Sequence, residues 1–427
     1  MSKNVLIVGS WAKEQITIEN IKRDPNVKIF CYLDTKNPGI IELTHGHKIG
    51  SLYKVNSIVE YAKEIKADMV IVTTALPLSL GVVNALENDH INVFGPNKSA
   101  ARLESDKTFS RRLMQKYKIN AIPKFEVFDK KDAAIEFAKN SNWQVAIKPT
   151  GLTEGLGVKV FGDQLKTDKE VTDYITKVLN NDDDPRSSVL VEEKLIGQEF
   201  SIQCLVNNDI VLTTPAVQDF KKLLPGDIGL NTASMGSYTD AGYRLPFMKQ
   251  TDYDLAVNLI KKTVLAFQQE TGDNIRGFLY GQFMLTEKGI KVIEYNFRPG
   301  DPEWLNTLTT LQDNVMNVIE SLFGKSHNEL NFENKATVCK YLVPKDYPMK
   351  LNQVLNVTFD KTQVQQNGAK IYYSCGMDEK GSLNVGSERG LAVVAKADTI
   401  IQASEKVEQG IKFIKGDFHY RADIGGK

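Results

Sequence analysis

The chain has few cysteines and no long apolar run, and both shortages narrow the classes of protein it can represent. Its four cysteines lie far apart in 427 residues and form no C-x-x-C motif; they are Cys31, Cys204, Cys339 and Cys375. This spacing indicates neither a disulfide framework nor a zinc site, so we expect a reducing, cytoplasmic location. The sequence also lacks the roughly 18 consecutive apolar residues of a membrane-spanning helix. We therefore predict no membrane association.

An excess of either charge is missing as well. The 53 Lys and Arg residues balance the 53 Asp and Glu residues, and the sequence pI is about 7.0. A neutral chain has no overall attraction to nucleic acid, so we predict small-molecule substrates and no nucleic-acid partner. The apolar share of 42%, with 30 Gly and 14 Pro, is that of a globular protein. The length suggests about two to four domains.

The first hundred residues alternate apolar runs with amphipathic segments. The runs at 5–8, 27–33 and 69–74 are continuous, as in strands covered on both faces, and 55–66 is amphipathic. This alternation predicts a doubly wound parallel sheet. A dinucleotide site is disfavoured, because Gly9 is followed by Ser10-Trp11-Ala12-Lys13 and not by the glycines of G-x-G-x-x-G.

Two lysines and a glycine-rich loop suggest a phosphate site. Lys107 begins a predicted helix, and Lys148 ends a predicted strand just before the loop 150–157. Lysines neutralise phosphate as point charges, and glycine loops let backbone N–H groups approach an anion. The alternatives are surface lysines and a flexible hairpin.

A strand, a polar connector and a second strand follow at 191–199. The connector has backbone groups that can bind an adenine edge, and Glu199 can accept hydrogen bonds from ribose hydroxyls. A charged hinge is the alternative explanation.

Oxygen ligands gather on two later strands. Glu294 and Asn296 are two residues apart in a predicted strand and so share one face, which Arg298 also shares if the strand stays extended. Gln282 lies on the preceding predicted strand. Such ligands suit Mg²⁺ that takes its remaining ligands from water and nucleotide phosphates. A surface salt bridge is the alternative.

The order of these features resembles the ATP-grasp superfamily. Further segments are similar to the phosphoribosylamine–glycine ligase family, most of all its archaeal branch; they are 218–222, 226–232, 235–238, 277–280, 294–298, 300–303 and 420–425. The resemblance implies an ATP-grasp α/β fold in three parts. These are an N-terminal doubly wound domain at 1–104, an ATP-grasp domain at 105–328 with a lid subdomain at about 119–195, and a small C-terminal α+β domain at 329–427.

The resemblance also implies an ATP-dependent ligase, a monomer or homodimer, that joins glycine to 5-phosphoribosylamine through glycyl phosphate in purine biosynthesis. It implies that Gln282, Glu294 and Asn296 hold Mg²⁺ or Mn²⁺. The nucleotide site would comprise Lys107, Lys148, Gly151, Gly155, Gly157, Glu192, Lys194, Leu195 and Glu199. The catalytic and acceptor residues would be Arg298, Asp219, Asn231 and Thr232.

Two loops depart from the family pattern. At 9–15 two glycines and an arginine are replaced, which places Trp11 where the ribose phosphate is expected. In the lid loop, Leu156 replaces a lysine and Glu154 adds a carboxylate. These changes leave two alternatives to the glycine ligase: a related ATP-grasp ligase with another acceptor, or a nucleotide-binding homologue without turnover.

Overall fold

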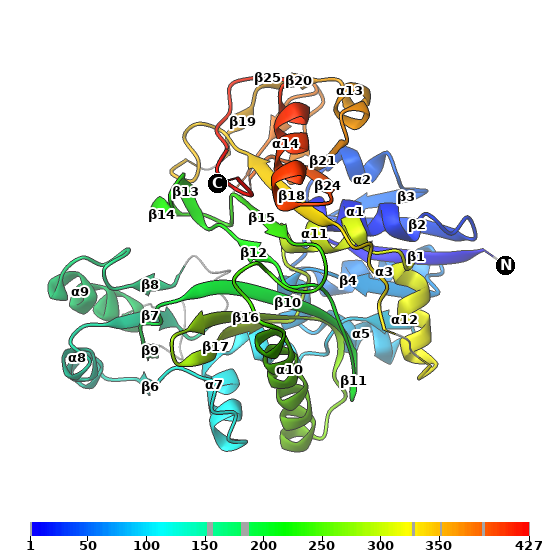
Figure 1. Ribbon diagram of the computed structural model, residues 1–427. Helices are drawn as coiled ribbons and strands as arrows, with labels where there is room; N and C mark the ends of the chain where they lie inside the picture. The colour runs from blue at the N-terminus through cyan, green and yellow to red at the C-terminus, as the bar shows by residue number, and fades with distance from the viewer. Residues whose placement is uncertain are drawn as a thin grey trace.

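The computed structural model describes residues 2–151, 157–180, 188–326, 329–350, 352–386 and 389–426. Figure 1 shows the blue N-terminal region at the right, a small teal sheet with two helices at the left, and the C-terminal region at the top. A long antiparallel sheet lies between them. In the described ranges, no helix combines the length and apolar character needed to cross a membrane.

The N-terminal region is a five-stranded parallel sheet in the order β3-β2-β1-β4-β5. The side chains of Val5 to Val8 are fully buried, which explains the continuous apolar run. The predicted doubly wound sheet is confirmed. Its elements are β1 (Lys3–Val8), α1 (Ala12–Ile21), β2 (Val27–Leu33), α2 (Pro38–Ile41), β3 (Gly46–Ile49), α3 (Val55–Glu64), β4 (Met69–Val72), α4 (Ala75–Ser79), α5 (Val82–Asn88) and β5 (Val93–Phe94).

Two helices connect this region to a four-stranded antiparallel sheet, β6-β9-β7-β8. Helices α8 and α9 pack against the sheet, and all six elements form what we call the lid subdomain. The connecting helices are α6 (Arg102–Ser105) and α7 (Lys107–Lys116). The lid subdomain comprises β6 (Phe125–Phe128), α8 (Lys131–Asn140), β7 (Val145–Pro149), β8 (Lys159–Val160), α9 (Asp168–Leu179) and β9 (Val189–Glu193).

The central sheet has the order β11-β10-β16-β17 and is antiparallel throughout. Helices α7 and α10 pack against it and against each other, which buries a separate apolar core. Short turns at 208–209 and 287–288 connect β10 to β11 and β16 to β17. The elements are β10 (Gln198–Asn207), β11 (Ile210–Thr213), α10 (Gln250–Thr271), β16 (Arg276–Thr286), β17 (Gly289–Asn296), α11 (Glu303–Thr310) and α12 (Val315–Phe323).

A five-stranded sheet, β12-β15-β18-β24-β21, takes strands from both sides of residue 328. Helices α11 and α14 pack against it. Its strands are β12 (Gln218–Asp219), β15 (Gly236–Thr239), β18 (Ala336–Leu342), β21 (Ala369–Tyr373) and β24 (Leu391–Ala397). The other elements here are the hairpin β13 (Lys222–Leu224) and β14 (Ile228–Asn231), then β19 (Val354–Leu355), β20 (Val357–Phe359), α13 (Lys361–Gln366), β22 (Gly376–Met377), β23 (Leu383–Asn384), α14 (Ile400–Ile411) and β25 (Ile414–Gly416).

Helix α1 lies between the N-terminal and C-terminal regions. Nine of its ten residues are buried, and it contacts β1, α11, α12 and β21. Two of its buried polar side chains bind distant segments: Gln15 Oε1 accepts from Tyr373 N at 2.9 Å, and Thr17 Oγ1 accepts from Trp304 Nε1 at 2.9 Å. One apolar core therefore extends through both regions.

Candidate active site

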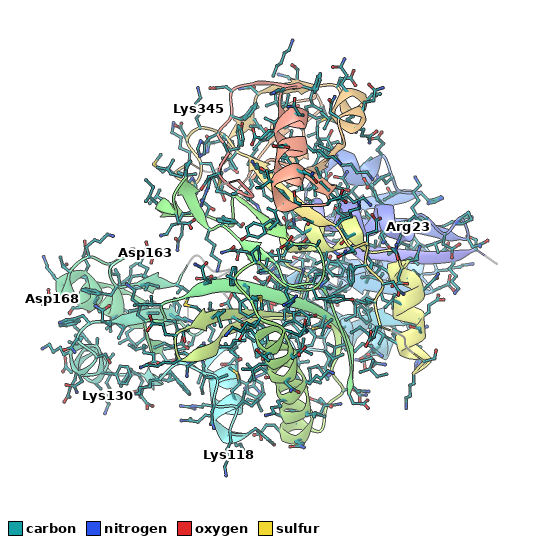
Figure 2. All side chains as sticks on the ribbon, in the orientation of Figure 1. Arg23, Lys118, Lys130, Asp163, Asp168 and Lys345 are labelled. Carbon is teal, nitrogen blue, oxygen red and sulfur yellow. The ribbon has the colours of Figure 1, made fainter. Side chains whose placement is uncertain are left out.

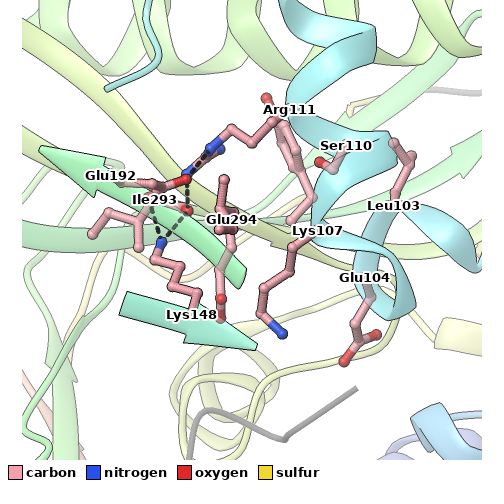
Figure 3. A pocket seen from close by; sticks show the side chains of 11 residues that line it. Leu103, Glu104, Lys107, Ser110, Arg111, Lys148, Glu192, Ile293 and Glu294 are labelled. Carbon is pink, nitrogen blue, oxygen red and sulfur yellow. Dashed lines mark hydrogen bonds and ion pairs between the residues drawn. The ribbon is translucent and has the colours of Figure 1, made fainter. Parts of the chain in front are cut away.

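The candidate site lies where the lid subdomain meets the central sheet. Helices α6 and α7 and strands β7, β9 and β17 line a small pocket. Figure 3 shows charged side chains from the helices and the strands converging there. The lining residues are Leu103, Glu104, Lys107, Ser110, Arg111, Lys148, Leu190, Glu192, Ile293, Glu294 and Tyr295.

Helix α7 directs two cations into this pocket. It begins after Asp106, whose carboxylate caps it by accepting from Phe109 N at 2.9 Å. The four-residue spacing of Lys107 and Arg111 places both on one helix face. Burial lowers the pKa of Lys107, and nearby Glu294 opposes that effect. Lys107 Nζ also donates to the carbonyl of Gly151 at 2.8 Å, which ties the helix to the start of the glycine loop.

A buried carboxylate anchors the deep end of the pocket. Glu192 Oε1 accepts from Arg111 Nε at 2.5 Å, and Oε2 lies 2.7 Å from Lys148 Nζ. All three side chains are at most 5% exposed. Burial alone would raise the pKa of Glu192, but Arg111 and Lys148 together lower it to about 2. This carboxylate is therefore ionised at neutral pH and fixes both cations.

A β-bulge adds one more acceptor for these cations. Gln282 pairs with Glu294 and Phe283 with Val292, so Ile293 is the extra residue. The carbonyl of Ile293 accepts from Arg111 NH2 at 2.5 Å and faces Lys148 Nζ at 3.4 Å. The bulge thus joins β17 to the buried ion pairs, while Glu294 and Lys107 extend away from them in Figure 3.

The three predicted metal ligands lie on neighbouring strands. Gln282 on β16 is directly opposite Glu294 on β17, and Asn296 Nδ2 donates to Glu294 Oε1 at 3.2 Å. Burial acts to raise the pKa of Glu294, but Lys107, Lys148 and further neighbours produce a net lowering. The carboxylate is therefore charged at neutral pH.

This donor set fits a hard cation that brings its own further oxygen ligands. Within the described residues no group of three His, Cys, Asp or Glu side chains could hold a metal ion. The set here has one carboxylate and two side-chain amides. Gln282 Nε2 and Asn296 Nδ2 both donate to carboxylates, so their amide oxygens remain as acceptors. Mg²⁺ characteristically uses one or two carboxylates together with phosphate oxygens and water.

Glu199 connects the predicted metal ligand Gln282 to the cation Lys221. Its Oε2 accepts from Gln282 Nε2 and from Lys221 Nζ, each at 2.9 Å. Its Oε1 has no hydrogen-bond donor within the described part of the chain. A carboxylate oxygen with open acceptor capacity is what the predicted ribose contact requires.

The connector after β9 is anchored by Lys194. Its N–H donates to Gln144 O at 2.9 Å, and its Nζ donates to Phe161 O at 2.8 Å. The backbone of half-buried Leu195 makes no hydrogen bond to any residue that the structure describes, so it can bind an adenine edge. Glu192, by contrast, lies within β9 between β6 and β7.

The predicted acceptor residues lie on β12 and the hairpin β13–β14. Thr232 donates from N and from Oγ1 to the carbonyl of Lys221, at 2.7 and 2.9 Å, one residue beyond Asn231 at the end of β14. Asp219 on β12 is surrounded by other charges. Burial raises its pKa to about 7, with Lys221 opposing and Glu303 and Glu199 adding to the rise.

Arg298 lies beyond the end of its strand. We expected Arg298 to share a face with Glu294 and Asn296 if the strand stayed extended. The strand does not extend that far, because β17 ends at Asn296. Glu104 on α6 sets the chain direction instead: its carboxylate accepts from Phe297 N at 2.8 Å and from Arg298 Nε at 3.1 Å. The guanidinium is therefore placed by α6 and not by strand alternation.

The glycines of the loop are described only at its two ends. Gly151 accepts from Lys107, as noted above, and the carbonyl of Gly157 accepts from Tyr174 OH at 2.7 Å. Gly155, and the departures Glu154 and Leu156, lie outside the described residues. At the other altered loop, Trp11 N donates to Glu14 Oε2 at 2.7 Å, so Glu14 caps α1 from within.

Sequence reasoning missed Arg111, Lys221, Glu104 and Glu303 as members of the site. Arg111 was detectable, since it follows Lys107 by four residues on a predicted helix. Lys221 lies within the quoted segment 218–222, beside the predicted Asp219. Glu303 likewise lies within the family-like segment 300–303, and Tyr280 OH donates to it at 2.9 Å. The position of Glu104 depends on its contacts with the distant residues Phe297 and Arg298, and no local pattern indicates it.

Comparison with known proteins gives one consistent result along the chain. Residues 3–104 match the N domain, residues 105–304 the ATP-grasp (A) domain and residues 337–427 the C domain of phosphoribosylglycinamide synthetase. The chain is similar to phosphoribosylamine–glycine ligase of Methanocaldococcus jannaschii, at 38% identity over 99% of this chain and 96% of that protein. The ligase of Methanopyrus kandleri is 39% identical over 99% of this chain and 95% of its own.

A solved structure supports the fold. The crystal structure of phosphoribosylamine–glycine ligase from Thermotoga maritima aligns with a TM-score of 0.82 at 24% identity, covering 99% of this chain and 100% of that one. Because three domain matches and full-length relatives agree, the chain belongs to the phosphoribosylglycinamide synthetase family.

Proposed function

We propose that the chain is an ATP-dependent ligase that joins glycine to 5-phosphoribosylamine in purine biosynthesis, giving glycinamide ribonucleotide, ADP and phosphate. Membership of the family supports the overall reaction. The single observation that carries the proposal is the pocket in which Lys107 and Lys148 lie beside the ionised carboxylate of Glu294. This arrangement of two lysines and a carboxylate suits a nucleoside triphosphate that binds together with a divalent cation.

The reaction has to overcome the poor electrophilicity of a carboxylate. Glycine first takes the γ-phosphoryl group of ATP, its carboxylate oxygen forming the new bond to phosphorus while ADP leaves. The amine of 5-phosphoribosylamine then attacks the carbonyl carbon of glycyl phosphate, and phosphate leaves. Enzymes accelerate such transfers mostly by positioning the groups and neutralising charge.

Charge neutralisation falls to the cations of the pocket. Lys107 and Lys148 bind phosphate oxygens, and Glu192 and the carbonyl of Ile293 hold Lys148 in place. Gln282, Glu294 and Asn296 would hold Mg²⁺ or Mn²⁺, which would supply further neutralisation of the phosphate oxygens when bound. Arg298, oriented by Glu104, stabilises negative charge on the acyl phosphate.

The remaining residues orient the substrates. Lys194 and Leu195 bind the adenine edge, Glu199 binds the ribose hydroxyls, and Gly151, Gly155 and Gly157 belong to the loop that covers the phosphates. Glu192 orients Arg111 and Lys148 through its ion pairs. Asn231 and Thr232 line the acceptor side. Asp219, whose pKa burial raises to about 7, can take the proton that the attacking amine loses.

The test is an ADP-release assay with Mg-ATP, glycine and phosphoribosylamine formed in place, each omitted in turn. We expect release to require both glycine and the amine. Release that needs glycine but is indifferent to the amine would support a ligase with another acceptor. Bound ATP without release would support a homologue without turnover. We infer a cytoplasmic monomer or homodimer, and light scattering after size-exclusion chromatography measures the assembly.

A further inference from the structure

An ion pair connects the lid subdomain to the hairpin β13–β14. Asp163, in the turn that follows β8, contacts Nζ of Lys222 on β13. We propose that this pair is a latch, which holds the turn 161–164 (the lid turn) against the hairpin and so couples the covering of ATP to the alignment of the acceptor side. The inference rests on the proposed function.

The lid turn is rigid on its own side. Gln164 Nε2 donates to Asp163 Oδ2 at 2.7 Å, and Gln164 Oε1 accepts from Val160 N at 2.8 Å. The carboxylate is therefore oriented before it meets Lys222. Figure 2 shows Asp163 on the upper edge of the lid subdomain, the edge nearer the hairpin β13–β14.

The predicted nucleotide connector also supports the lid turn. Lys194, predicted to contact the nucleotide, donates from Nζ to Phe161 O, and this carbonyl lies two residues before Asp163. A movement of Lys194 when the adenine ring binds therefore shifts the lid turn and, with it, Asp163 of the latch. This contact gives the lid turn a physical connection to the nucleotide site.

The hairpin β13–β14 is the immobile side of the latch. The Lys222 side chain is only 16% exposed, and its carbonyl accepts from Arg421 NH1 at 3.1 Å. Arg421 is buried and also pairs with Asp227 and Asp423, each at 2.6 Å. The hairpin is thus held from behind by the C-terminal tail, so the lid subdomain is the partner that moves when the latch opens.

The hairpin residue Lys222 is adjacent in sequence to a lysine that contacts the predicted ribose and acceptor residues. Lys221, the neighbour of Lys222, bonds Glu199 with its ammonium and Thr232 with its carbonyl. A latch at Lys222 therefore aligns the predicted ribose and acceptor contacts when the lid turn docks. Covering the site in this way protects an acyl phosphate from water.

The experiment compares Asp163→Asn, Lys222→Met and the double variant with the wild-type chain. Phosphate release and glycinamide ribonucleotide formation are measured in one reaction, with saturating Mg-ATP, glycine and amine. We expect each single variant to raise the phosphate-to-product ratio about two- to fivefold, the range of a partly exposed ion pair. The double variant should be no worse than the single ones, because both remove one interaction.

A matched control is available far from the site. Lys345 pairs with Asp417 in the C-terminal region, and Asp417→Asn removes a lysine–aspartate pair without touching the lid. It should leave the ratio unchanged. Unchanged ratios in both latch variants, or additive effects in the double variant, would overturn the latch.

A second readout does not depend on turnover. With Mg-ATP bound, hydrogen exchange in peptides spanning the lid turn should be about two- to fivefold faster in each latch variant than in the wild type and in Asp417→Asn. Equal exchange rates would also overturn the latch. A wild-type chain without glycine- and amine-dependent ADP release would instead refute the proposed function, leaving the exchange experiment to decide the latch.

Discussion

The buried ion pairs of Glu192 offer the most direct test of how the lid subdomain is held on the site. Glu192→Gln keeps the shape of the side chain but removes its charge, which leaves Arg111 and Lys148 buried without their counter-ion. The pKa of Glu192 is about 2 in the folded chain against an ordinary 4.5, a difference equivalent to about 3 kcal/mol. Breaking a buried ion pair from one side typically costs about 3–5 kcal/mol.

Hydrogen exchange followed by mass spectrometry localises this loss in a chain with several folding units. At pH 7 we expect amides of β7 and β9 to exchange about a hundredfold faster in Glu192→Gln than in the wild type, since about 1.4 kcal/mol corresponds to a factor of ten. Peptides of β1 and β2 should be unaffected. The matched control is Glu193→Gln: the Glu193 side chain makes no ion pair within the described part of the chain.

The pH dependence provides a second check with a definite sign. Because the pKa of Glu192 is lower in the folded state, the unfolded chain takes up the proton first as the pH falls. The stabilisation is therefore complete above about pH 5 and disappears toward pH 2. At pH 3 the difference between wild type and variant should be about two-fifths of its value at pH 7. Less than a fivefold change in exchange at pH 7, or a difference that grows in acid, would refute the reasoning.

Three further predictions concern the site. Glu294→Gln should lower ADP release at least about a hundredfold while the chain still folds, because the cation loses its charged ligand; retained activity would show that the metal assignment is wrong. Asp219→Asn should have a higher thermal midpoint than the wild type at pH 8 but not at pH 4. The pKa of Asp219 is raised from an ordinary 3.8 to about 7, so ionising this side chain at pH 8 destabilises the folded wild-type chain. Equal midpoints at pH 8 would contradict the burial argument. Mg-ATP at about a hundred times its Kd should stabilise the chain by about 2.7 kcal/mol and raise its midpoint, and EDTA should reduce that shift; the same shift with and without EDTA would argue against Gln282, Glu294 and Asn296 as metal ligands.

The sequence alone determined the local elements and the residues they carry. Continuous apolar runs predicted β1 and β2, and the helix predicted at Lys107 is α7. The two-residue period of a strand placed Glu294 and Asn296 on one face, and the structure has them bonded. These features depend on neighbours a few residues away, so a local pattern is enough to predict them.

The tertiary structure decided which of these residues meet and how they ionise. Glu192 lies 81 residues from Arg111, and their ion pair forms only because the fold brings β9 and α7 together at one pocket. Strand alternation placed Arg298 on the face of Glu294 and Asn296 if the strand stayed extended, but β17 ends at Asn296 and Glu104 orients the guanidinium. The five-stranded sheet likewise joins β12 and β15 to β18 across nearly a hundred residues. The raised pKa of Asp219 depends on burial and on the charges of Lys221, Glu303 and Glu199, two of which come from distant segments, so it arises only once the chain has folded and water has been excluded.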